Sequence, residues 1–123
     1  MTDFLSLEDL LTLADDLRVG PIRDVGLLAA AAYRPASQLW GSGVYPGLED
    51  KASALLEALF RNQSLVDGNK RLGWPAAFVF LDIDDWRIDA PDNEAHDLIV
   101  AVAAGECNIG QTAASPRKWR RLA

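Results

Sequence analysis

Residues 48–83 read LEDKASALLEALFRNQSLVDGNKRLGWPAAFVFLDI, and two helices joined by a short turn account for this pattern. Apolar residues recur at spacings of three and four over residues 48–62 and again over residues 69–83, as on one face of a helix. Pro75, in the second turn of the later helix, is expected to remove one hydrogen bond. The positions expected to be buried are Ala52, Leu55, Leu56, Leu59 and Phe60 in the first helix and Leu72, Ala76, Val79, Phe80 and Ile83 in the second.

Helical spacing continues toward the N-terminus. Residues 7–17 are expected to form an amphipathic helix that is capped by Ser6 with Asp9 three residues later, and that ends at Gly20-Pro21. Asp24 is the expected cap of a second helix, which continues through an alanine run to residue 33. Residues 36–47 are rich in turn formers and predict a loop, with the aromatic side chains Trp40 and Tyr45 packed onto the core.

The remaining sequence predicts more helix and little strand. Residues 86–89 alternate and indicate one short extended piece, and helices are expected over residues 92–105 and 111–114. The pattern therefore indicates an all-α fold, a helical bundle of five or six helices with little or no strand. Residues 1–116 are expected to form one helical domain, followed by the short basic tail 117–123.

Composition narrows the class of protein. A chain of 123 residues has room for one hydrophobic core, and its net charge of −6 disfavours broad nucleic-acid binding. One cysteine and one histidine exclude a disulfide framework and a multi-histidine metal centre. No apolar run is long enough to span a membrane, and no basic segment begins the chain, so a cytoplasmic protein is expected. The basic tail is interpreted as a solvated end or as a contact surface for an acidic partner.

Residues 66–71, Val-Asp-Gly-Asn-Lys-Arg, carry the candidate chemistry. Backbone N–H groups at the start of a helix attract anions, and Gly68 permits the tight backbone that an anion cradle needs. Lys70 and Arg71 are unfavourable in a first helical turn unless a phosphate binds there. Asp67 is a carboxylate of the type that holds Mg²⁺ beside phosphate oxygens. A second interpretation is a plain polar turn in which Asp67 serves as the N-cap.

Residues 63–71, Gln-Ser-Leu-Val-Asp-Gly-Asn-Lys-Arg, resemble the signature of the Fic/Doc superfamily, and specifically its Doc branch. That signature reads His-x-Phe-x-(Asp/Asn)-(Gly/Ala)-Asn-Lys-Arg, and the last five positions match fully. Similar residues also flank the motif, at Arg23 to Leu28, Arg34-Pro35, Tyr45-Pro46 and Ala103 to Glu106. The resemblance therefore covers most of the chain and implies a compact all-α bundle of about six helices.

The resemblance also implies an activity. Fic members transfer AMP from ATP to a protein hydroxyl. Doc members have lysine where Fic members have a second glycine, and they transfer the terminal phosphate instead. Lys70 places this chain with the Doc group, whose target is elongation factor Tu and whose partner is an antitoxin of the Phd type. ATP and Mg²⁺ are the implied cofactors. Asp67 would hold the metal, and Gly68, Asn69, Lys70 and Arg71 would bind phosphates.

Gln63 departs from the family pattern, because the family has its catalytic histidine at this position. A glutamine amide does not titrate near neutral pH and cannot act as a general base. Leu65 in place of phenylalanine is a milder change, since both side chains can fill a core position. The chain has all the residues of the anion cradle but lacks the catalytic base. Two origins are consistent with this: a toxin that was deliberately inactivated, and a natural degenerate copy. His96 is interpreted as a surface or capping residue, and Cys107 as a small buried apolar residue.

Three rival functions follow from these observations. The chain could be a non-catalytic nucleotide- or partner-binding module that kept the cradle after losing the base. AMP transfer is disfavoured by Lys70. A helix-turn-helix DNA-binding protein is disfavoured by the acidic composition. Trp40, Trp74 and Trp86 are expected in the core, whereas Trp119 lies among basic residues and is expected to be exposed.

Overall fold

A computed structural model describes residues 2–84, 86–88 and 120–122. Four α-helices dominate these residues: α1 (Leu7–Leu17), α2 (Val25–Tyr33), α3 (Leu48–Arg61) and α4 (Asn69–Ile83). A 3₁₀ turn, η1 (Arg34–Ala36), follows α2. The mostly helical prediction is confirmed, while the helices expected over 92–105 and 111–114 lie outside the described residues, as do His96, Cys107 and Trp119.

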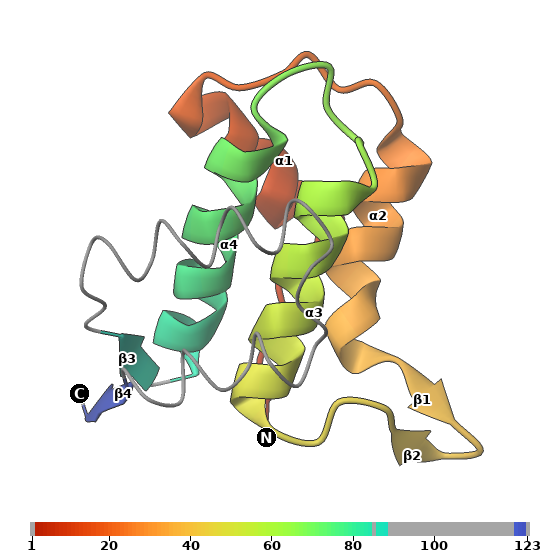
Figure 1. Ribbon diagram of the computed structural model, residues 1–123, viewed down its shortest axis with the longest axis vertical. Coiled ribbons are helices and arrows are strands. Elements are labelled where there is room, and N and C mark those ends of the chain that lie inside the picture. Colours follow the sequence, from red (N-terminus) through yellow and green to blue (C-terminus); the bar gives the residue numbers. More distant parts are fainter. Residues whose placement is uncertain (1, 85, 89–119, 123) are drawn as a thin grey trace.

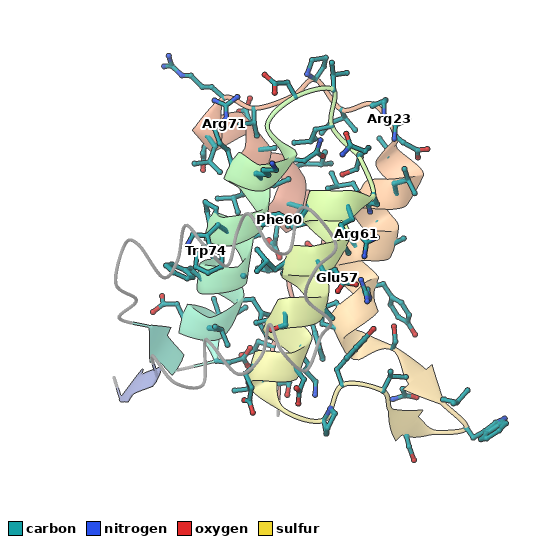
Figure 2. All side chains as sticks on the ribbon, in the orientation of Figure 1. Arg23, Glu57, Phe60, Arg61, Arg71 and Trp74 are labelled. Carbon is teal, nitrogen blue, oxygen red and sulfur yellow. The ribbon has the colours of Figure 1, made fainter. Side chains whose placement is uncertain are left out.

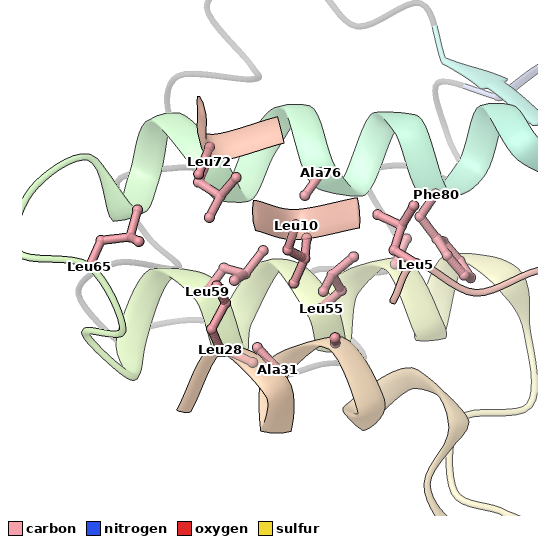
Figure 3. Close-up of a cluster of buried hydrophobic side chains, with 14 of the residues drawn as sticks. Leu5, Leu10, Leu28, Ala31, Leu55, Leu59, Leu65, Leu72, Ala76 and Phe80 are labelled. Carbon is pink, nitrogen blue, oxygen red and sulfur yellow. The ribbon is translucent and has the colours of Figure 1, made fainter. Parts of the chain in front are cut away.

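The helices α3 and α4 run side by side in opposite directions, and the loop that joins them lies at one end of the molecule (Figure 1). Helix α2 lies along α3, and α1 contacts both α2 and α4. The cluster of buried side chains between these helices includes Leu10, Leu28, Leu55, Leu59, Leu72 and Phe80 (Figure 3). Gly73 lets α3 and α4 approach closely, because a Cβ at this position would overlap the ring of Phe60.

The caps predicted for α1 and α2 are present. Ser6 and Asp9 form a reciprocal capping box on α1, and the Asp24 carboxylate accepts a hydrogen bond from the Leu27 N–H at 3.0 Å. Helix α1 ends earlier than Gly20-Pro21 predicts. Arg18 takes the left-handed conformation (φ 57°), and its N–H bonds back to the last turn of the helix.

The expected loop over residues 36–47 contains a hairpin of two-residue strands, β1 (Gln38–Leu39) and β2 (Ser42–Gly43), paired with Leu39 opposite Ser42. The prediction that Trp40 packs onto the core is wrong, since this side chain is 95% exposed at the hairpin tip. Two predicted core positions of α4, Val79 and Ile83, are also exposed, because α1 and α3 together cover less of that helix than its apolar stripe offers.

Two further features tie distant segments together. The Arg34 guanidinium donates to Glu57 at 2.9 Å and to the Tyr45 hydroxyl at 3.0 Å, which anchors η1 to α3. Burial opposes charging of Arg34, but these hydrogen bonds outweigh it and raise the pKa of the guanidinium. The expected extended piece is the strand β3 (Trp86–Ile88), which pairs antiparallel with β4 (Arg120–Leu122). Residues 120–122 of the basic tail therefore form a paired strand.

Candidate phosphate-binding site

A cavity of about 440 Å³ lies at the loop between α3 and α4. Its lining brings together every candidate site residue predicted from the sequence: Gln63, Asp67, Gly68, Asn69, Lys70 and Arg71. Phe60 and Val66 also line it. Sequence spacing did not indicate Phe60 as a site residue, because its apolar neighbours assign it to the buried stripe of α3.

Helix α4 begins on Gly68 without a side-chain cap among the described residues. The interpretation of Asp67 as the N-cap is therefore wrong. The Asp67 side chain is exposed instead, and its Oδ2 lies 3.5 Å from Arg71 Nη2. The first N–H groups of α4 are thus not satisfied by a capping side chain, and such groups form a site for anions when cations stand beside them.

Gly68 shapes the start of α4 for two separate reasons. Its φ of 90° is a conformation that side-chain-bearing residues rarely adopt. A Cβ at this position would also lie 2.6 Å from Val19 Cβ and 2.7 Å from Val19 Cγ1. The loop is therefore pressed against the segment after α1, and only glycine fits there.

The residues between α1 and α2 hold this loop from outside. The Gly20 N–H donates to the Asp67 carbonyl at 3.1 Å, and the Val66 N–H donates to the Pro21 carbonyl at 2.9 Å. Leu65 is 1% exposed and fills the core, which agrees with the expectation that leucine can replace phenylalanine there. The loop is therefore held on one side by backbone hydrogen bonds and on the other by a buried side chain.

The Asn69 side chain braces the loop from within. Its Oδ1 accepts from the Leu65 N–H, and its Nδ2 donates to the Leu65 carbonyl, both at 3.0 Å. The second N–H of the side-chain amide takes no part in these two hydrogen bonds. The main-chain N–H of Asn69 lies in the first turn of α4, which has no side-chain cap. Lys70 and Arg71 are exposed at the cavity, where their charges can reach a bound anion.

Gln63 has a left-handed backbone (φ 58°) immediately after the end of α3. Its place in the lining puts the position of the family histidine beside the candidate phosphate-binding residues 67–71. Among the described residues that line the cavity, Asp67 supplies a carboxylate. The described residues contain no group of three or more His, Cys, Asp or Glu side chains that could hold a metal ion. A metal at this site would therefore need oxygen ligands from phosphate or water in addition to Asp67.

The chain is clearly similar to a known protein. A protein named Toxin Doc, from Mycolicibacterium smegmatis, is 44% identical over 119 residues, which cover 93% of this chain and 91% of the relative. No family model matches the sequence. In the described part of the chain, no helix is long and apolar enough to cross a membrane.

Proposed function

The chain belongs to the Doc toxin family, and from this premise we propose that it is a toxin of a toxin–antitoxin pair whose loop between α3 and α4 binds ATP. The observation that carries the proposal is the uncapped start of α4, which opens into a cavity lined by Lys70, Arg71 and Asp67. By resemblance, the ancestral reaction transfers the terminal phosphate of ATP to a hydroxyl of elongation factor Tu and stops translation.

Residues of the cavity have separate roles in binding ATP and Mg²⁺. Main-chain N–H groups of α4 and the cations Lys70 and Arg71 bind phosphate oxygens, Arg71 through a forked guanidinium and Lys70 as a point charge. Asp67 supplies a carboxylate for Mg²⁺, which neutralises phosphate charge when bound. Asn69 keeps the loop in shape through Leu65. A protein hydroxyl beside residue 63 would be the acceptor, and Gln63 cannot take its proton.

Calorimetric titration with ATP tests the binding site. We expect binding that depends on Mg²⁺, and Asp67→Ala should remove that dependence while leaving the melting temperature nearly unchanged, because Asp67 caps no helix. Arg71→Ala should weaken binding about tenfold or more, as expected for loss of a charged hydrogen bond. Arg18→Ala is the matched control, since it removes an exposed cation outside the lining. Equal affinity of Arg71→Ala and the parent chain would show that residues 67–71 are only a turn.

Gln63→His tests the catalytic part of the proposal. Restoring a base should increase phosphate transfer by about 10²- to 10⁴-fold and arrest bacterial growth. Mass spectrometry of the target distinguishes an added phosphate from an added AMP. Normal growth at equal protein level, with ATP binding retained, would favour the non-catalytic nucleotide-binding module. That second candidate is supported by the glutamine at the catalytic position.

A toxin of this kind requires an antitoxin, and a hollow of about 540 Å³ between α2 and α3 offers apolar surface for it. Leu27, Ala30 and Ala58 contribute to its lining, with Arg61 among its polar residues. Such a surface suits a segment that folds as an amphipathic helix on binding. Ala30→Arg should reduce co-purification with the product of the neighbouring gene at high salt, whereas Gln38→Arg, on the hairpin, should not. Retention of the partner by Ala30→Arg would place the antitoxin elsewhere.

A further inference from the structure

Arg23 precedes α2, yet its side chain binds the end of α3. Its Nε donates to the Gln63 carbonyl at 2.6 Å, and its Nη2 donates more weakly to the Asn62 carbonyl at 3.4 Å. Carbonyl groups at a helix C-terminus carry partial negative charge, so a guanidinium is favourable there. A planar guanidinium can also hold two neighbouring carbonyls in one orientation, which a lysine ammonium cannot do.

The carbonyls held by Arg23 flank an unusual backbone. Gln63 has φ 58°, a conformation that costs a non-glycine residue free energy and persists only where the surroundings enforce it. Asn62 contributes from one side, since its Oδ1 accepts from the Ser64 N–H at 3.2 Å and its Nδ2 donates to the Leu27 carbonyl at 2.9 Å. The Ser64 carbonyl accepts from the N–H of Arg23 at 2.8 Å.

We propose that Arg23 is a positioning residue, which fixes the backbone of residue 63 and thereby directs that side chain into the phosphate-binding cavity. Arg23 is not among the described residues that line the cavity, whereas Gln63 is, so the hydrogen bond from Arg23 to the Gln63 carbonyl links Arg23 directly to the lining. Arg23 and Arg71 lie at the same end of the molecule, near the loop between α3 and α4 (Figure 2). This inference rests on the proposed function, in which residue 63 is the position of the catalytic base.

The first experiment is independent of activity. In ¹⁵N-labelled full-length protein, Arg23→Ala should shift the amide resonances of Gln63 and Ser64 and speed their hydrogen exchange. Arg18→Ala is the matched control, because it removes an exposed cation from the end of α1 whose side chain makes no hydrogen bond or ion pair among the described residues. Arg23→Lys keeps the charge without the two-point contact and should shift the same amides. Unchanged amides in both Arg23 variants would overturn the proposal.

The second experiment separates turnover from binding. In the Gln63→His background, Arg23→Ala should lower kcat by about ten- to a hundredfold, the scale expected for a misplaced reacting group. The KM for ATP should stay within about twofold, because the phosphate contacts do not involve Arg23. Arg18→Ala, outside both hollows, should leave kcat unchanged. If Arg23→Ala unfolds, Arg23→Lys provides the comparison, with a smaller fall in kcat.

The outcomes distinguish this proposal from the function on which it rests. A kcat equal to that of the Gln63→His parent, or a fall matched by Arg18→Ala, would overturn the positioning role. An inactive Gln63→His parent would refute the proposed kinase activity instead. In that case the amide comparison alone decides whether Arg23 holds residue 63.

Discussion

At the candidate site, Gly68→Ala is expected to be the single added methyl group that lowers the stability of the protein most. A side chain at φ 90° costs about 1–2 kcal/mol. The added Cβ would meet Val19 Cβ at 2.6 Å and Cγ1 at 2.7 Å, and rotation of the valine side chain cannot move its Cβ away. Overpacking of this kind costs about 1–3 kcal/mol, so the unfolding free energy should fall by about 2–5 kcal/mol.

Gly41→Ala is the matched control for the steric part. Gly41 also has a positive φ, 81°, but a Cβ there would meet nothing within 4 Å. The unfolding free energy of this variant should fall only by the conformational cost of about 1–2 kcal/mol. Urea denaturation followed by circular dichroism compares the two, with the midpoint shifting at constant slope if only the native state has changed.

A double-mutant cycle isolates the contact with Val19. Val19→Gly removes both atoms that the new Cβ would strike, so the loss caused by Gly68→Ala should be smaller in the Val19→Gly background. ATP affinity should fall in Gly68→Ala and not in Gly41→Ala, because only Gly68 sets the direction of the first N–H groups of α4. Equal stability losses in the two alanine variants would refute the idea that Val19 presses on the loop.

Three further changes test the fold. Gly73→Ala should destabilise the protein by about 1–3 kcal/mol because its Cβ overlaps the Phe60 ring, and Phe60→Leu should relieve part of this loss in thermal melts. Glu57→Ala should cost about 1.5–3 kcal/mol, since it leaves the half-buried Arg34 without its carboxylate, and a double-mutant cycle with Arg34→Ala measures the coupling. Trp40→Asn should not lower stability, because asparagine tolerates the left-handed backbone and the indole is exposed; it should remove a solvent-exposed component of the tryptophan fluorescence.

Helix positions and their caps were predictable because they depend on residues close together in the chain. The bonds between Ser6 and Asp9 and from Leu27 to Asp24 span three residues, so the local pattern contains them. The residues of the candidate phosphate-binding site were predictable for the same reason, since the five consecutive positions 67–71 supply the glycine, the carboxylate and the cations. Sequence alone thus determined four helices and the composition of the candidate site.

Tertiary packing decided the features that depend on distant partners. The exposure of Trp40 at the hairpin tip and of Val79 on α4 depends on which surfaces the helices cover, and the local sequence pattern does not contain that information. Gly68 looked like a turn glycine, and only the fold showed that Val19 occupies the space of its missing side chain. Arg23 reaches Gln63 across forty positions of sequence. Such contacts form because packing of α2 against α3 brings the two segments together, and no local spacing records them.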